Sequence, residues 1–292
     1  MFATLVGTLP SPARARGRED RLRVQLEAQV AAGMDLLSFA EPAPPTDALV
    51  DAWLGASRLA EMLGDRPVKA AIIGPMTVAH GSPNDSDVDA TRAVVDALGA
   101  AGCPLVEIHE PVATAIGADE VARGRFRAAH EHLVDGISVH ACLAITGGNA
   151  DPAGAETLFV AGYRSFLFDL ILGPDNWRLI AAAPAGAGIV AGAIDHRAGV
   201  REVPETGVWA GHYAASTGGR GIERVGLATA GSLAGLDWDQ AVARMSVLGE
   251  AARVAAMPRG EGMARAMDPR ALDIRSAAMG RYAPHRSRRA RP

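Results

Sequence analysis

Short apolar segments alternate with longer amphipathic segments along most of the chain. The apolar segments have strand-like composition, and most lack the strict apolar–polar alternation of a strand with one solvated face. Strands that are covered on both faces are expected to look like this. The segments between them have helical periodicity; in residues 19–32, for example, Leu22, Leu26 and Val30 trace roughly one face. The pattern therefore predicts repeated β/α units.

Eight such units occupy about 255 residues, which is the size and order of a (β/α)8 TIM barrel, an α/β fold. A doubly wound open sheet is the main alternative, but it usually has fewer strands and often a glycine-rich phosphate loop after the first strand. No GxGxxG or P-loop motif follows the first strand here. The predicted strands are 4–9, 36–40, 70–73, 105–109, 137–143, 165–170, 188–194 and 224–228. The predicted helices are 19–32, 47–63, 87–100, 119–133, 155–161, 176–183, 205–214 and 238–255.

Composition narrows the class of protein. The chain has 292 residues, of which 49% are hydrophobic and 21% charged, with a net charge of -4. These values exclude a disordered chain, a fibrous protein and a broadly basic nucleic-acid binder. We expect a single barrel domain over residues 1–256 and an arginine-rich extension over 257–292. The final HRSRRARP is interpreted as a solvated tail, with contact to nucleic acid as the less favoured alternative.

The number of cysteines and the lengths of the apolar runs indicate the cellular compartment to expect for the protein. Only Cys103 and Cys142 occur, so no disulfide framework is expected, which suits a reducing compartment. The arginines of the amino-terminal segment follow its apolar stretch, the wrong order for a secretory signal. No apolar run reaches the roughly 18 residues that span a bilayer. We therefore expect a cytoplasmic protein without a membrane partner.

Functional residues of a TIM barrel lie where its strands end, at the carboxyl-terminal mouth. Gly7 and Thr8 lie near the end of the first predicted strand, and Glu41 directly follows the second. His109 ends the fourth predicted strand and Glu110 follows it. Glu41 and Glu110 each precede a proline, which predicts carboxylates that point into the mouth and bind a cationic amine. The alternative is an ordinary solvated glutamate. We predict these five residues to be substrate-binding.

His140 and Cys142 are separated by one residue on the fifth predicted strand. Two side chains at this spacing point to the same side of an extended strand and can bind one ion. Asp169 on the next strand adds an oxygen ligand at a similar expected height. The three residues are therefore predicted metal ligands. The alternative is a buried thiol beside a hydrogen-bonded histidine.

Seven segments together resemble the carboxyl-terminal catalytic barrel of cobalamin-independent methionine synthase, including its short archaeal-type relatives, over residues 2–256. This family lies in a superfamily with uroporphyrinogen decarboxylase. The segments are VGTLPSP at 6–12, MDLLSFAEP at 34–42, GPMT at 74–77, VEIHEP at 106–111, SVHACL at 138–143, AIDHRAGVRE at 193–202 and RVGLATAG at 224–231.

The resemblance implies a mechanism. In that family a zinc ion held by His, Cys, Glu and a second Cys binds a thiol as thiolate, which takes a methyl group from N5 of a methylated folate. By position, His140 and Cys142 match the first two ligands, Asp169 the glutamate, and Glu41 a carboxylate for the substrate amine. Zinc is accordingly the expected metal and 5-methyltetrahydrofolate the expected donor.

Three positions depart from the family pattern. The second zinc cysteine is replaced by Val225, an amine-binding aspartate by His109, and the catalytic histidine by Arg197. His196, next to Arg197, is the expected replacement proton donor, so both are predicted catalytic residues. These departures weaken the case for methionine synthesis specifically and leave the acceptor thiol open, with homocysteine as one candidate.

The sequence thus predicts an enzyme, a methyl or alkyl transferase that acts on a small thiol with a folate-type donor. One alternative is a metal-free enzyme of the uroporphyrinogen-decarboxylase-like superfamily that acts on a carboxylated ligand through Glu110, His196 and Arg197. Another is a non-catalytic relative that binds a folate or thiol compound as a sensor or partner subunit.

Overall fold

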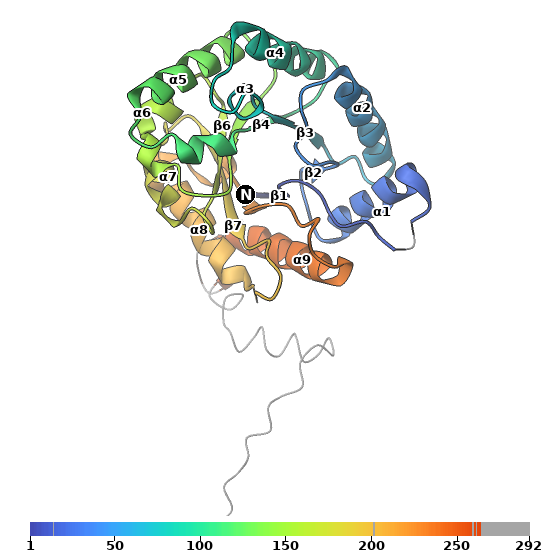
Figure 1. The fold of residues 1–292 in the computed structure, drawn as a ribbon. Helices are drawn as coiled ribbons and strands as arrows, with labels where there is room; N and C mark the ends of the chain where they lie inside the picture. The colour runs from blue at the N-terminus through green and yellow to red at the C-terminus, as the bar shows by residue number, and fades with distance from the viewer. Residues whose placement is uncertain (14, 201, 259, 261, 264–292) are drawn as a thin grey trace, which may run out of the picture.

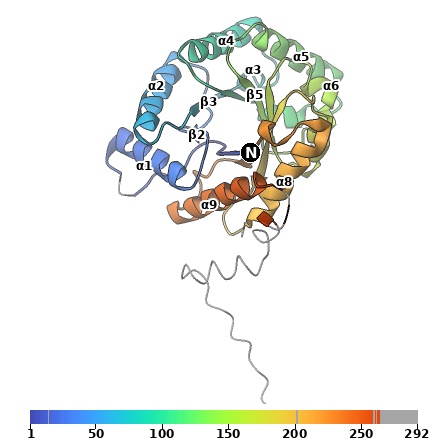
Figure 2. The same cartoon turned by 180° about the vertical axis from the view of Figure 1, so that it is seen from behind.

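A parallel sheet of eight strands forms the centre of the molecule. The computed structural model describes residues 1–13, 15–200, 202–258, 260 and 262–263. Helices surround the strands as an outer ring, which Figure 1 and Figure 2 show from opposite sides. The strands are β1 (Phe2–Thr4), β2 (Leu37–Ser38), β3 (Val68–Ile73), β4 (Val106–His109), β5 (Ala141–Ile145), β6 (Ser165–Asp169), β7 (Gly188–Ile194) and β8 (Val225–Thr229).

The strand order closes the sheet into a barrel. Neighbours run β1-β8-β7-β6-β5-β4-β3-β2, and all of the paired strands are parallel. A single parallel bridge from Thr4 to Leu36 joins the two remaining edges. This nearly closed arrangement confirms the predicted (β/α)8 barrel and excludes the doubly wound open sheet.

Two apolar layers follow from the two-residue period of the strands. Side chains that point outward pack against the helices in one large cluster, which includes Ile108, Leu143 and Phe166. Side chains that point inward fill the barrel itself in a smaller cluster, formed by Val6, Cys142, Ala144, Leu167, Val190 and Ala228. Cys142 therefore lies in the packed interior.

The helices lie close to their predicted positions. They are α1 (Gly17–Ala31), α2 (Asp47–Met62), α3 (Pro75–Val78), α4 (Asp85–Ala100), α5 (Glu120–Val134), α6 (Ala155–Leu158), α7 (Trp177–Ala182), α8 (Pro204–Ser216) and α9 (Trp238–Ala255), with short 3-10 turns between several of them. The bounds of α9 and β7 match the prediction residue for residue. The sequence analysis missed the single turn α3.

The first strand was expected over residues 4–9 and spans Phe2–Thr4. The discrepancy that most affects the candidate site concerns the fifth strand. It was expected over residues 137–143, but β5 spans Ala141–Ile145. Residues 137–140 instead form a loop that follows α5 and the turn at 135–136. A shift of this size moves His140 from the middle of the strand to the position before its start.

Two further expectations concern the carboxyl-terminal extension and membrane-spanning helices. Most of the predicted extension over residues 257–292 lies outside the described residues. Within the described part of the chain, no helix is long and apolar enough to cross a membrane.

Candidate functional site at the carboxyl-terminal mouth

Polar groups from three loops meet at the carboxyl-terminal mouth of the barrel. Thr8 follows β1, Glu41 follows β2 and Ser232 follows β8. The Glu41 carboxylate accepts a hydrogen bond of 3.0 Å from the backbone N–H of Thr8 and another from the Ser232 hydroxyl. Glu41 remains exposed, so its carboxylate is held in place and is still open to a cationic ligand. The structure thus brings the predicted rim residues Thr8 and Glu41 into contact and adds Ser232.

Gly7 makes room for this carboxylate. Its φ of +68° lies in the left-handed region that favours glycine. A β carbon at this position would lie 2.6 Å from Oε2 of Glu41 and 2.7 Å from Cβ of Ser232. The backbone conformation and the space therefore both require glycine here.

We expect Gly7→Ala to destabilise the fold by about 1–3 kcal/mol, because it adds backbone strain and displaces Glu41. Urea unfolding measures the effect. The matched control is Gly102→Ala, because Gly102 also has a positive φ of +92° but no atom within 4 Å of its would-be β carbon. If Gly7→Ala costs no more than the control, the close packing against Glu41 is wrong.

Three interacting polar side chains, those of Lys69, Glu107 and His109, lie inside the barrel below the mouth. Lys69 on β3 forms an ion pair with Glu107 on β4, and its ammonium also donates a 2.6 Å hydrogen bond to the carbonyl of Leu5. The other carboxylate oxygen of Glu107 lies 3.1 Å from Nε2 of His109. All three side chains are almost fully buried. His109 is the last residue of β4, so of these three side chains it lies closest to the mouth.

The contacts with Lys69 and His109 keep Glu107 ionised. Burial acts to raise the pKa of Glu107, but the charge of Lys69 and the hydrogen bond from His109 together outweigh it and hold the pKa below its ordinary value. Sequence analysis did not identify Lys69 or Glu107. The available signal was a charged residue within each of two otherwise apolar strand segments, VKAAII and VEIH.

The loop after β7 places a guanidinium at the mouth. Arg197 bonds to the Asp195 carboxylate at 2.6–3.1 Å, and its side chain remains about half exposed. Asp195, and more weakly Asp169 and Glu202, raise the pKa of Arg197, so Arg197 and Asp169 lie within electrostatic reach of each other. The neighbouring His196 packs with its ring against Gly231, and its buried Nδ1 has no hydrogen-bond partner among the described residues.

Glu110 does not face the mouth, which corrects its prediction as a substrate-binding residue. Its side chain is fully buried. The carboxylate accepts backbone hydrogen bonds from Met76 at 2.9 Å and Thr77 at 2.8 Å, and lies 3.4 Å from Nε2 of His130 on α5. It therefore fixes the first turn of α3 against the barrel, and its role is structural.

The predicted metal ligands do not converge. His140 precedes β5, and its carbonyl accepts a hydrogen bond from the backbone of Val106, the first residue of β4. His140 therefore lies at the amino-terminal end of the barrel. Cys142 pairs with Ser165, and Asp169 lies four residues further along β6, about 13 Å away at 3.3 Å per residue. The Asp169 carboxylate instead accepts backbone N–H bonds from the loops at the mouth.

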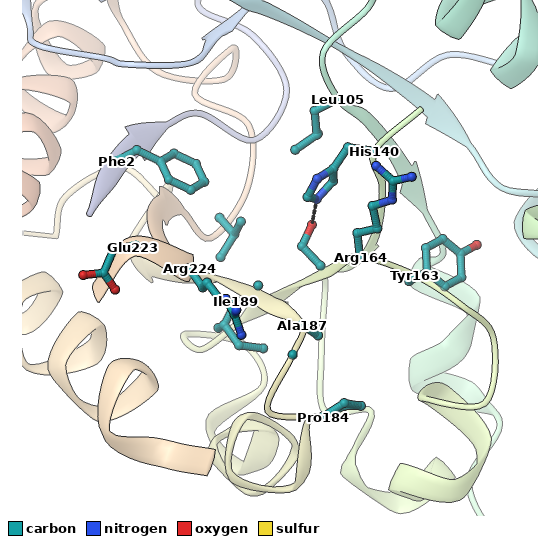
Figure 3. A pocket seen from close by; sticks show the side chains of 14 residues that line it. Phe2, Leu105, His140, Tyr163, Arg164, Pro184, Ala187, Ile189, Glu223 and Arg224 are labelled. Atoms are coloured by element: carbon teal, nitrogen blue, oxygen red, sulfur yellow. Dashed lines mark hydrogen bonds between the residues drawn. The ribbon is translucent and has the colours of Figure 1, made fainter. Parts of the chain in front are cut away.

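The environment of the thiol supports the alternative interpretation. Cys142 is fully buried in the apolar interior of the barrel, and this burial raises the pKa of its thiol to about 12. His140 is hydrogen-bonded through Nε2 to the Ser165 hydroxyl at 2.8 Å (Figure 3). This arrangement is a buried thiol beside a hydrogen-bonded histidine. Within the described part of the chain, no group of three metal-ligating side chains is present.

Val225 on the last strand lies away from the mouth in the same way as His140. It is the first residue of β8, so the position that resembles the second zinc cysteine also lies at the amino-terminal end. The residues that follow β5 and β8 at the mouth are Thr146-Gly147-Gly148 and Ala230-Gly231-Ser232. They carry hydroxyl groups and glycines in place of imidazole and thiolate.

Comparison with solved structures confirms the fold. A B12-independent methionine synthase from Shewanella sp. W3-18-1, in complex with selenomethionine, is 17% identical, with a TM-score of 0.64 and coverage of 86% of this chain and 96% of that one. A Listeria monocytogenes protein named as a vitamin-B12-independent methionine synthase is 12% identical, with a TM-score of 0.70 and coverage of 88% and 98%.

A methyltransferase from Methanosarcina mazei is similar at 13% identity, with a TM-score of 0.61 and coverage of 86% of this chain and 93% of that chain. No protein-family model and no curated protein match the sequence. The likeness therefore establishes the barrel that the sequence resemblance implied.

Proposed function

We propose that the chain is a transferase that moves a methyl or another small alkyl group onto a small thiol at the carboxyl-terminal mouth of its barrel. The observation that carries the proposal is a barrel shared with two methionine synthases and a methyltransferase over 86–88% of the chain. Polar groups with complementary roles gather at the mouth of this barrel. The proposed donor carries its methyl group on an amine nitrogen, as 5-methyltetrahydrofolate does.

Glu41 is the proposed site for an ammonium group of the acceptor. Its carboxylate is exposed and is already oriented by Thr8 and Ser232. A preoriented carboxylate loses little freedom when it binds a cation. Arg197 offers the opposite charge at the same mouth, where it suits a carboxylate of the donor or acceptor.

His109 is the proposed group for proton transfer. Methyl transfer forms a carbon–sulfur bond and breaks a carbon–nitrogen bond, and the thiol proton leaves while the released amine nitrogen gains one. An imidazole held by Glu107 can take the first proton and deliver the second, because its hydrogen bond to Glu107 fixes its orientation. His196 was the expected proton donor, but His109 has the better-defined partner.

Zinc held by His140, Cys142 and Asp169 does not fit this site. A catalytic zinc site needs about three protein ligands at roughly 2.0–2.3 Å from one ion, with a fourth position open to substrate. Two of these residues lie toward one end of the barrel and the third at the other. No step of the proposed reaction is therefore assigned to a metal bound by these residues.

The same geometry favours a second candidate, a metal-free reaction on a carboxylated ligand in the manner of the uroporphyrinogen-decarboxylase-like superfamily. It would use Arg197 to bind the carboxylate and His109 to move a proton. Glu110, which the sequence had assigned to this alternative, is buried against α3 and takes no part.

The proposal is tested by incubating the protein with 5-methyltetrahydrofolate and a panel of thiols, with and without chelator, and measuring S-methylated products by mass spectrometry. We expect turnover with at least one thiol that carries an amine. Glu41→Gln should raise KM for that thiol and leave KM for the amine-free 3-mercaptopropionate unchanged. Glu61→Gln, at an exposed position on α2, is the matched control. Absence of product from every thiol would overturn the transferase, and decarboxylation of a porphyrinogen would select the second candidate.

A further inference from the structure

A hollow lies at the end of the barrel opposite the mouth. Its volume is about 630 Å³, and its lining residues come from the starts of the strands and the loops that lead into them. His140 and Ser165 line it at the starts of β5 and β6, and Phe2 lines it from β1 (Figure 3). A cavity of this volume is in the range of sites for small ligands. The proposed transferase does not use it.

The walls of this amino-terminal cavity are largely apolar. Phe2 and Leu105 pack beneath the interior cluster of the barrel and contribute partly buried side chains. Glycine at position 226 allows the Phe2 ring to lie directly against the strand, because a β carbon there would collide with the ring. Further along the wall, Pro184 and Ala187 add apolar surface. The body of a ligand in this cavity must therefore be apolar.

The polar part of the lining is cationic on one side. Arg164 is exposed, and its side chain makes no hydrogen bond or ion pair with any residue that the structure describes. Its guanidinium lies beside His140 in Figure 3. Arg224 donates a 3.2 Å hydrogen bond to the carbonyl of Ala185, and no described carboxylate pairs with it. Glu223 also lines the cavity, but its carboxylate is turned away from His140 (Figure 3).

His140 contributes a neutral polar group. Burial, and secondarily the charge of Arg164, lower the pKa of His140, so its ring is uncharged at neutral pH. Its Nε2 is occupied by the Ser165 hydroxyl. Two arginines of the lining, Arg164 and Arg224, therefore carry a charge that no described carboxylate neutralises, and of the two the Arg164 side chain also makes no hydrogen bond within the described residues.

We propose that the amino-terminal cavity binds a small organic acid, with its apolar body against Phe2 and Leu105 and a single carboxylate paired with Arg164. An arginine binds a carboxylate through two parallel hydrogen bonds, which selects an acid over its neutral amide. The site is separate from the proposed transferase site, because the two lie at opposite ends of the strands.

Isothermal titration with 2-naphthoate and with its neutral analogue 2-naphthamide tests this site. We expect the acid to bind at least about tenfold more tightly than the amide, and Arg164→Gln to weaken the acid about tenfold while leaving the amide unchanged. Arg58→Gln is the matched control, because Arg58 is an exposed arginine on α2, remote from the cavity. Arg164 is exposed, so its replacement should not impair folding.

Three outcomes would overturn the site: no binding of the acid, equal binding of acid and amide, or equal losses in Arg164→Gln and Arg58→Gln. Arg197→Gln distinguishes the two ends of the barrel. If it abolishes naphthoate binding while Arg164→Gln does not, the acid binds at the mouth, and the amino-terminal cavity is not its site. Because this test measures binding alone, its result is independent of whether the protein transfers methyl groups.

Discussion

Lys69→Met should be among the most destabilising single substitutions in this chain, at a cost of about 3–5 kcal/mol. The substitution keeps a long apolar stem but removes the ammonium that neutralises Glu107. Both side chains are almost completely buried, so water cannot replace the lost partner. Urea or guanidinium unfolding, followed by circular dichroism, measures the loss.

The double variant Lys69→Met/Glu107→Gln identifies the cause. Removing both charges should recover much of the stability, because a buried pair contributes little in itself while a buried unpaired charge is costly. Arg253→Met is the control for an exposed pair: it removes a 2.7 Å contact with Glu250 at the surface and should shift the unfolding midpoint little. If the double variant is as unstable as Lys69→Met, the loss comes from packing and the electrostatic explanation is wrong.

The same carboxylate predicts a pH dependence. Because the pKa of Glu107 is lower in the folded protein than its ordinary value, the ionised form stabilises the fold. This stability is fully present above the unfolded-state pKa of about 4.3 and is lost as pH falls through the folded-state pKa. The stability advantage of the native chain over Glu107→Gln, measured by urea unfolding at a series of pH values, should therefore shrink below about pH 4.3.

The fold was largely predictable because its signal is distributed. Each β/α unit repeats the same change of periodicity, so an error in one unit leaves the barrel assignment intact. The segments of β7 and α9 have clear boundaries, and their predicted bounds were correct. The loops that follow β1 and β2 contain the predicted rim residues Gly7, Thr8 and Glu41, although β1 ends at Thr4 and the expected strand ran to residue 9.

The metal site was the main error because it depended on one strand boundary. In residues 137–145 the run ISVHACLAI is apolar at most positions, so periodicity alone does not show where pairing begins. Placing the strand a few residues early put His140 at the wrong end of the barrel. Ser232, Lys69 and Glu107 were missed for a different reason: their roles depend on partners that are remote in sequence, such as Glu41, which is 191 residues from Ser232.

The central claim is that chemistry occurs at the carboxyl-terminal mouth and that the His140–Cys142 pair does not take part. It is tested by comparing His109→Gln with Cys142→Ala in the S-methylation assay, with circular dichroism to confirm that both variants are folded. We expect His109→Gln to lower kcat by about 10²- to 10⁴-fold, because it removes the group that moves the proton. Cys142→Ala should retain kcat within about twofold, since this buried thiol is a packing residue. Loss of activity in Cys142→Ala, with full activity in His109→Gln, would contradict the account.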